Sequence, residues 1–469
     1  MNKIIITTLA LLSSVLSFSN EIFQLKLEKN EKLEATQTIE FHSDMTMHIA
    51  ITKKSGDNRY FYTPFLVDAD SKVLKCEVFG YVQKLALLSH HLNNNLVTLV
   101  NYDEEGKLLC ILDFDLKTGQ SVKSYLKTDE RPNNVFRSND KTTLIFLDKK
   151  SGVSVKEITN SSNIATQKIE VPAEDLKLFK TIVNASPDAV NQNEFVRNGS
   201  IAKAKSYLIG ENYIVTYEDE NKEIELLKFD LKTASLTHNK LSIAKAATSI
   251  RDFSNFVFDD KIAILGTLKE DAIVSVYDIT TLKALKHFSF SQFVDAVKLK
   301  QFLKISSKVN FKSTLTANKG AKGNYVLRLD NVDANTYTYY NNWWLHHWFF
   351  QQQMFHQQMF RQQMIDMNRN MMPGRGFGPG LHDEEKDSYF YNEETKDESI
   401  QIVIDPNLNL MESATEETVF PEIKREKYTD KYKDDQGKKK LSFGFVKNEL
   451  RYMYMDKESK TINISFEKL

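Results

Sequence analysis

The sequence predicts an all-β fold made of repeated β-hairpins, and two observations support this prediction. First, three segments share one pattern, an apolar strand followed by Asp, an aliphatic residue, a spacer and Thr: Cys110–Thr118 (CILDFDLKT), Glu225–Thr233 (ELLKFDLKT) and Val274–Thr281 (VSVYDITT). Second, another apolar strand lies about 15 residues before each Asp, at Leu96–Tyr102, Tyr213–Tyr217 and Ile262–Leu265. Short polar turns separate the strands of each pair, so we expect each unit to be a hairpin.

The Asp of each repeat is predicted to end its strand in a turn. A carboxylate at this position can accept a hydrogen bond from the backbone N–H two residues later, and the following Thr can reinforce the turn. We therefore expect Asp115, Asp230 and Asp278 to have structural rather than chemical roles. Weaker copies of the same strand ending are found at Asp68, Asp148, Asp330, Asp405 and Asp456.

The spacing of these Asp residues predicts how the hairpins are arranged. Several intervals are close to 50 residues, as between Asp68 and Asp115 or between Asp278 and Asp330. Repeats of about 40–50 residues that contain only short strands are typical of β-propeller blades. We expect a β-propeller of seven or eight blades, with an array of β-sandwiches as the alternative. The strand ending also resembles the blade ending V-x-V-Y-D-x-x-T-G of bacterial β-propellers, with Thr118 and Gly119 as the nearest match, and this resemblance identifies no single family.

The composition fits one large β-rich body. The chain has 469 residues, of which 41% are hydrophobic, so it can bury a sizeable core. Helix-like patterns are short and occur at Ala173–Thr181 and Phe293–Leu303. The predicted organisation is a signal peptide at 1–19, propeller blades at 20–337, an insertion at 338–395 and closing blades at 396–469.

The N-terminus has the pattern of an export signal. Lys3 precedes an apolar run, Ile4–Leu16, and the small residues Ser17 and Ser19 are spaced like a signal-peptidase site. We expect cleavage before Asn20 and an exported protein, periplasmic or extracellular. No other stretch is long and apolar enough for a transmembrane helix, so none is expected in the mature chain.

The charge balance bears on the class of partner. The chain has 62 basic and 63 acidic residues and a net charge of −1, whereas a nucleic-acid-binding protein needs a pronounced basic surface. We expect a protein partner or an envelope component, no nucleic acid and no cofactor. The two cysteines, Cys76 and Cys110, lie in apolar strands, and either a disulfide or two buried thiols fits the sequence.

The insertion has the most unusual composition in the chain. Tyr339–Phe350 (YYNNWWLHHWFF) contains all three tryptophans, and the pentads QQMFH, QQMFR and QQMID follow it at residues 352–366. A period of five places successive Met residues on different sides of a helix and on alternating faces of a strand. The pattern therefore does not predict an amphipathic membrane helix.

Three interpretations of this insertion remain open. It is a low-complexity expansion with no dedicated function, an interaction arm, or a Cu(I) site. The interaction arm would use aromatic and Met side chains: Trp343, Trp344, Trp348, Phe349, Phe350, Met354, Phe355, Met359 and Phe360. The copper site would use imidazole and thioether ligands: His346, His347, His356, Met354, Met359, Met364 and Met367.

Other candidate sites carry weaker signals. His42, Asp44 and His48 alternate along one predicted strand, as metal ligands can, although paired polar residues are the commoner explanation. No nucleophile elbow, zinc helix, phosphate loop or dinucleotide fingerprint occurs in the sequence. The sequence therefore favours a non-enzymatic binding or scaffolding protein of the cell envelope. The alternatives are a periplasmic copper-handling protein and a propeller enzyme whose site is built from loops.

Overall fold

The described part of the chain is almost entirely β-structure. The computed structural model describes residues 20–41, 44–190, 196, 199–242, 250–320, 322–334, 389–391, 399–420, 422–424, 432, 437–446 and 449–468. Within these residues, seven sheets contain three to five strands each, and one further sheet contains two strands. Apart from β15, which runs parallel to β16, the paired strands within the seven larger sheets are antiparallel.

The sheets follow the order of the chain and are named here by that order. The first sheet contains β2 (Glu31–Phe41), β3 (Met45–Lys54), β4 (Tyr60–Val67) and β5 (Val73–Lys75), with β6 (Phe79–Tyr81) also paired to β4. The second contains β7 (Ala86–Asn93), β8 (Leu96–Asp103), β9 (Leu108–Asp115) and β10 (Ser121–Lys127). The third contains β11 (Asn134–Arg137), β12 (Thr142–Asp148), β13 (Gly152–Asn160) and β14 (Asn163–Glu170). The fourth contains β15 (Asp188–Val190), β16 (Ala204–Ile209), β17 (Asn212–Glu218), β18 (Glu223–Asp230) and β19 (Ser235–Ser242).

The remaining sheets include one that joins the two ends of the chain. The fifth contains β20 (Asp252–Phe258), β21 (Lys261–Thr267), β22 (Ala272–Asp278) and β23 (Ala284–Ser289). The sixth contains β24 (Phe311–Lys319), β25 (Tyr325–Asp333) and β27 (Ile400–Ile404). The seventh contains β29 (Lys438–Val446), β30 (Glu449–Asp456), β31 (Thr461–Lys468) and, beside β31, the N-terminal strand β1 (Asn20–Lys26). A separate parallel pair is formed by β26 (Tyr389–Tyr391) and β28 (Glu422–Lys424).

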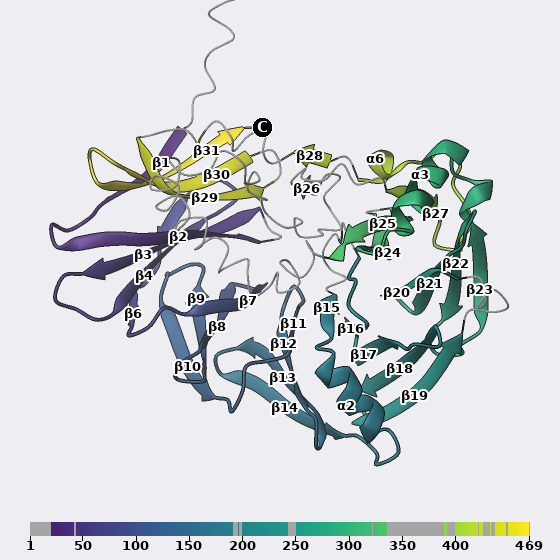
Figure 1. The fold of residues 1–469 in the computed structure, drawn as a ribbon. Helices are drawn as coiled ribbons and strands as arrows, with labels where there is room; N and C mark the ends of the chain where they lie inside the picture. Colours follow the sequence, from purple (N-terminus) through teal and green to yellow (C-terminus); the bar gives the residue numbers. More distant parts are fainter. Residues whose placement is uncertain are drawn as a thin grey trace, which may run out of the picture.

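Successive sheets are arranged around a common centre, and the seventh lies beside the first (Figure 1). First strands of neighbouring sheets are in contact, namely β29 with β2, β7 with β11, β11 with β15, and β20 with β24. Each of these strands therefore lies near the common centre, and later strands of the same sheet lie further from it. This arrangement confirms the all-β class and the β-propeller fold. The prediction of seven or eight blades stays a prediction.

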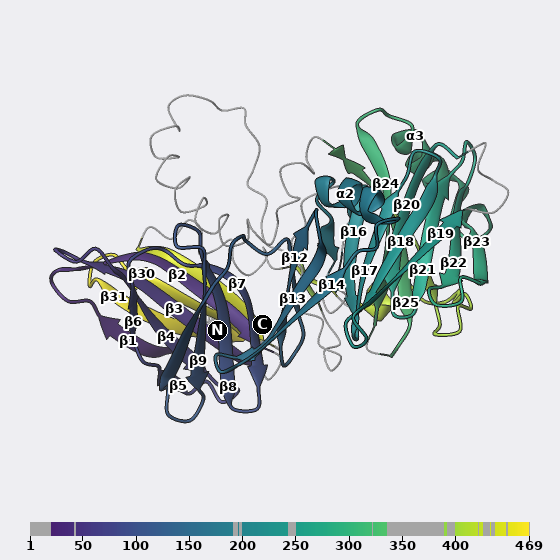
Figure 2. The ribbon, with the colours of Figure 1, turned by 90° about the horizontal axis from the view of Figure 1, so that it is seen from below.

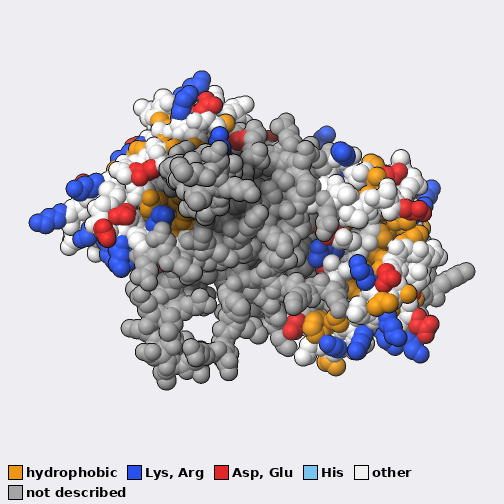
Figure 3. Space-filling model, turned by 90° about the horizontal axis from the view of Figure 1, so that it is seen from above, with side chains coloured by type: hydrophobic (Ala, Val, Ile, Leu, Met, Phe, Trp, Pro, Cys, Tyr) orange, Lys and Arg blue, Asp and Glu red, His pale blue; other side chains and the backbone are white. Residues whose placement is uncertain are grey.

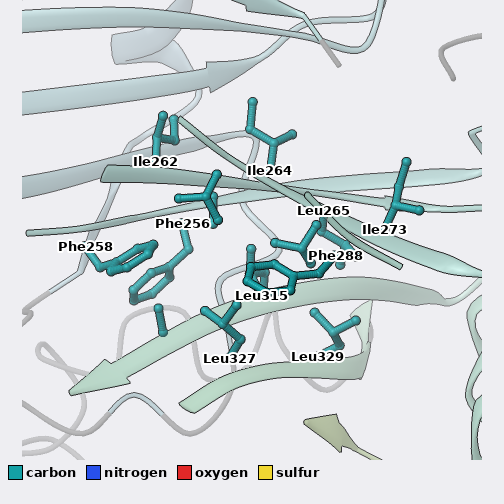
Figure 4. Packing of buried hydrophobic residues seen from close by; sticks show 14 of the residues in the cluster. Phe256, Phe258, Ile262, Ile264, Leu265, Ile273, Phe288, Leu315, Leu327 and Leu329 are labelled. Atoms are coloured by element: carbon teal, nitrogen blue, oxygen red, sulfur yellow. The ribbon is translucent and has the colours of Figure 1, made fainter. Parts of the chain in front are cut away.

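Hydrophobic layers between neighbouring sheets form the core. One cluster joins the fourth, fifth and sixth sheets, and within it Phe256, Ile264 and Phe288 pack with Leu315 and Leu327 (Figure 4). Separate clusters join the seventh sheet to the first, the first to the second, the second to the third, and the third to the fourth. Because strands buried on both faces have apolar residues at consecutive positions, several strands lack the simple alternation of a half-exposed strand.

The predicted hairpins and Asp turns are confirmed. β8 pairs with β9, β17 with β18, and β21 with β22. The Asp115 carboxylate accepts hydrogen bonds from the backbone N–H groups of Lys117 and Thr118, at 2.9 and 2.7 Å. Equivalent bonds are made by the carboxylates of Asp230, Asp278 and Asp456.

Each of these four turns also has a residue with positive φ four positions after the Asp. These residues are Gly119 (φ 69°), Ala234 (φ 54°), Leu282 (φ 58°) and Lys460 (φ 54°). The left-handed conformation explains why the blade ending that Cys110–Gly119 resembles has Gly at this place. The other three copies adopt the same turn with a side chain there.

The interpretation of Asp330 as a turn residue is wrong. Asp330 lies within β25, opposite Thr314 of β24, and only 1% of the residue is exposed. The third strand of the sixth sheet ends instead at Asp405, whose carboxylate accepts backbone N–H groups of Asn407 and Asn409, each at 2.8 Å. The interval of about 50 residues that led to Asp330 therefore compared different strands of neighbouring sheets.

Short helices lie in some connections between sheets. Helix α2 (Leu176–Asn184) precedes the fourth sheet, and η1 (Phe290–Gln292) and α3 (Ala296–Ser306) precede the sixth. Both α2 and α3 lie toward the same edge of the sheets when the molecule is seen from below (Figure 2). They overlap the two helix-like patterns predicted from the sequence, with each boundary about three residues later. The short helix α6 (Glu416–Val419) follows the sixth sheet.

The two cysteines are free and buried, so the disulfide interpretation is wrong. Cys76 and Cys110 both belong to the apolar cluster between the first and second sheets. Burial raises the pKa of each thiol to about 12, which keeps both thiols protonated and disfavours their oxidation.

Candidate functional site

The root of the predicted insertion lies in the sixth sheet. β25 pairs directly with β27, with Tyr325 opposite Ile404 and Leu329 opposite Ile400. Two antiparallel neighbours can be joined by as few as two residues, yet here residues 334–399 form the connection. The long connection therefore begins and ends on adjacent strands of one sheet.

A buried ion-pair cluster stabilises this root. The Arg328 guanidinium of β25 donates to the Asp330 carboxylate at 2.9 Å and to the Glu416 carboxylate of α6, also at 2.9 Å. The three side chains are only 6%, 1% and 8% exposed. Burial alone would lower the pKa of Arg328, but the two carboxylates outweigh burial and raise it above its usual value. Arg328 thus links β25 to the segment that follows β27.

The apolar side of the root is equally well packed. Val326 of β25, Val403 of β27 and Phe420 form a small cluster with Met411 and Val419 around α6. On the other face, Leu327 and Leu329 belong to the large cluster shared with the fifth sheet. The sixth sheet therefore provides a rigid base for the residues that leave it.

A second charge network lies where the fourth and fifth sheets meet. The Lys205 ammonium, 1% exposed, donates to the Glu218 carboxylate at 2.5 Å, the Ser254 hydroxyl at 3.0 Å and the Asn255 carbonyl at 3.2 Å. Burial raises the pKa of Glu218, against the opposing effect of Lys205. An ammonium group has three N–H donors, and all three of Lys205 have partners. This arrangement suits structural linkage of two sheets and leaves Lys205 without a free donor for substrate.

The same region extends to the sixth sheet through Asp252 of β20. Its carboxylate accepts from the backbone N–H of Ser313 at 2.5 Å and lies 3.3 Å from the Lys312 ammonium of β24. Polar groups thus connect the first strands of the fifth and sixth sheets next to their apolar core. Sequence reasoning missed this network, and the available signal was the charged Lys205 within an otherwise apolar strand.

His48, one of the weaker metal candidates, is a structural residue. The Thr38 hydroxyl lies 2.9 Å from Nδ1 of His48 and the Thr46 hydroxyl 3.1 Å from Nε2, so both ring nitrogens are hydrogen-bonded. Burial, together with the Arg451 guanidinium, lowers the pKa of His48 to about 3, and the ring is neutral. His42 lies outside the described residues, while Asp44 follows directly after that gap.

The predicted binding residues of the insertion all lie outside the part of the chain that the structure describes. This applies to the interaction arm and to the alternative copper ligands: Trp343, Trp344, His346, His347, Trp348, Phe349, Phe350, Met354, Phe355, His356, Met359, Phe360, Met364 and Met367. Within the described residues, no group of three or more His, Cys, Asp or Glu side chains is placed to hold a metal ion. A search of the same residues finds no helix with the length and hydropathy needed to span a membrane.

Comparisons with known proteins yield structural likeness without sequence relatives. No protein-family model matches the chain, and no curated protein matches it significantly. Uncharacterized protein lmo1340 from Listeria monocytogenes EGD-e shares 12% identity at a TM-score of 0.30, over 68% of this chain and 84% of that one. The β-propeller domain of the Trilobed protease from Pyrococcus furiosus shares 11% identity at a TM-score of 0.30, over 64% of this chain and 82% of that one. A Synechocystis apocarotenoid oxygenase shares 9% identity at a TM-score of 0.27, over 56% of this chain and 63% of that one. Likenesses this remote carry no inference about function.

Proposed function

We propose that this chain is an exported, non-enzymatic binding protein of the cell envelope, in which the sheets hold residues 338–395 for contact with a protein partner or another envelope component. The observation that carries the proposal is the direct pairing of β25 with β27 on either side of that segment. Loop closure costs only about 0.6 kcal/mol for each doubling of loop length, so a long insertion at one hairpin is compatible with a stable sheet. A dense set of Trp, Phe and Met residues on a firmly held base suits capture of a partner.

The root geometry supports this proposal further. Arg328 fixes the strand before the insertion to α6 after it, and both faces of the sixth sheet are packed. Because the sixth sheet is already ordered before binding, a partner that binds the insertion does not have to order the sheet as well. Preorganisation of this kind lowers the entropic cost of binding.

Deletion of the insertion tests the proposal. Residues 338–395 are replaced by a short Gly/Ser linker, and the circular dichroism spectrum and thermal midpoint are compared with those of the full chain. We expect the sheets to stay folded. The envelope component captured by the full chain is identified by mass spectrometry, purified and titrated against both proteins, and we expect the deletion variant not to bind it.

A matched variant separates binding from folding. Replacement of Trp343, Trp344 and Trp348 by Ala keeps the length of the insertion and should weaken binding by at least about tenfold, because each Trp is a typical anchor of an interface. A deletion variant that cannot fold, or that binds the purified component as well as the full chain does, would refute the proposal. If instead the deletion removes only tight Cu(I) uptake, measured by competition with a chelator, the copper-handling alternative is correct. Turnover of a small substrate by the deletion variant would establish the enzyme alternative.

The exported location is tested separately at the N-terminus. Mass spectrometry of the protein from its native host should find Asn20 as the first residue, and a soluble cytosolic form that begins at Met1 would contradict export.

A further inference from the structure

Helix α3 and its flanking residues form a basic surface with exposed apolar side chains, called here the α3 surface. Residues 296–310 contain four lysines and no acidic residue. The α3 surface consists of Lys298, Lys300, Lys304 and Lys308 with Phe293, Val297 and Val309.

The lysines of this surface are free to meet an anionic partner. All four are exposed, and within the described ranges none of them forms an ion pair, although Lys308 Nζ lies 5.5 Å from the centroid of the Phe311 ring. The nearest acidic residue in sequence, Asp295, caps the helix, since its carboxylate accepts the backbone N–H groups of Val297 and Lys298 at 2.9 and 3.1 Å. The positive charge of the α3 surface is therefore largely uncompensated.

The α3 surface also exposes three large apolar side chains. Val309 is 100% exposed, Val297 is 65% exposed and Phe293 is 42% exposed. Few large hydrophobic residues in the described ranges are exposed to this degree. Figure 3 shows orange and blue side chains close together at the lower right, with some red ones beside them, at the end of the molecule that carries α3.

Packing fixes which side of α3 faces outward. Leu299, Phe302 and Leu303 are buried in the core shared with the fifth and sixth sheets. Because these residues recur every three to four positions, they occupy one side of the helix, and the lysines project from the remaining sides of the helix. The helix cannot turn its charged side inward without opening the core.

We propose that the α3 surface docks on the anionic lipid headgroups of a bilayer. Several lysines on one exposed segment are attracted to an anionic membrane, and the exposed apolar side chains at the two ends of that segment can enter the boundary between headgroups and acyl chains. The methylene groups of the lysine side chains can also lie in that boundary while the ammonium groups stay in water. A soluble polyanion would satisfy the lysines but not the apolar residues, which is why a lipid surface fits better. The proposal does not depend on the insertion.

Co-sedimentation with vesicles tests the docking. The full chain should bind vesicles that contain phosphatidylglycerol and should not bind vesicles of phosphatidylcholine alone. Binding should fall sharply as ionic strength rises toward about 1 M, where the Debye length is about 3 Å. A variant with Gln at positions 298, 300, 304 and 308 should lose on the order of 600-fold in the partition coefficient, since each Lys near such a surface contributes about fivefold.

A control with the same charge change distinguishes a local surface from general electrostatics. Four other exposed lysines lie on β10 or in turns of the second and third sheets, namely Lys117, Lys123, Lys127 and Lys149, and their replacement by Gln should leave vesicle binding within about twofold of that of the full chain. All variants keep the same N-terminus and the same insertion, so contributions from those segments cancel. A third variant, Val297→Ser with Phe293→Ser, should bind about tenfold more weakly even at high ionic strength, because two apolar anchors are lost.

Three results would overturn the proposal. The full chain fails to bind phosphatidylglycerol vesicles, the two Lys-to-Gln variants lose binding equally, or the apolar variant binds as the full chain does. Binding of heparin by the full chain, lost in the α3 variant and without any vesicle binding, would show that the surface recognises soluble polyanions instead.

Discussion

Removal of the Arg328 guanidinium should destabilise the sixth sheet more than any exposed ion pair could. Arg328→Met removes the guanidinium that donates to both the Asp330 and the Glu416 carboxylates, and the three side chains are at most 8% exposed. Loss of one partner of a buried pair typically costs about 3–5 kcal/mol because the remaining charge stays desolvated. We therefore expect the free energy of unfolding to fall by about 3–5 kcal/mol.

Two comparison variants give this prediction its specificity. Arg59→Met removes an equally short bond, 2.8 Å to Asp57, but that Arg side chain is 53% exposed, so the loss should be at most about 1 kcal/mol. Neutralising all three members of the cluster, with Asp330→Asn and Glu416→Gln added to Arg328→Met, should recover most of the stability. Urea unfolding should be followed by far-ultraviolet circular dichroism, which reports on the strands directly, since all three tryptophans belong to the insertion and none belongs to a strand of the seven sheets. A loss below about 1 kcal/mol for Arg328→Met, or a triple variant no more stable than the single one, would refute the reasoning.

Two further predictions concern exposed turns and edges. The His238 ring lies between two carboxylates, 2.6 Å from Asp175 and 2.9 Å from Glu225, and although partial burial opposes protonation, these bonds raise its pKa. The stabilisation of the fold by the protonated ring is then complete below about pH 6.5 and is lost as the pH rises through the folded-state pKa. His238→Gln should therefore lower the free energy of unfolding by about 1 kcal/mol near pH 5.5 and by less near pH 8.5. An equal loss at both pH values would contradict this prediction. Ala234→Gly should raise the free energy of unfolding by about 0.5–1 kcal/mol, because Ala234 has φ 54°. Gly119→Ala should lower it, because the added Cβ would lie 3.0 Å from a backbone carbonyl oxygen. Effects of the opposite sign in thermal unfolding would show that the turn is not strained.

The repeated turn was predictable because its information is local. Asp115 and Thr118 lie within one turn, and the carboxylate reaches backbone groups that are two and three residues away. The same locality explains the recognition of the hairpins, whose strands are joined by a few polar residues. Asp330 shows where this reasoning stops, because the Arg328 guanidinium that it binds also donates to Glu416, which lies on α6, 88 positions after Arg328.

The charge networks depend on contacts that a single sequence does not encode. Lys205 meets Ser254 and Asn255 only because the fourth and fifth sheets pack face to face. Nothing in the spacing of these residues distinguishes them from exposed polar residues of other strands. The insertion was recognised by composition alone, and its predicted roles stay predictions because its residues lie outside the described ranges.

The pairing of β1 with β31 has a consequence for the order of events in folding. Asn20 lies opposite Phe466, so the outer edge of the seventh sheet is formed by residues from opposite ends of the chain. Contacts of such high sequence separation form slowly, because most of the chain must be ordered before the ends meet. During synthesis the first strand emerges long before its neighbour and has no partner until β31 is present. The closing step therefore comes last, and deletion of either β1 or β31 would remove the strand pair that joins the two ends of the chain.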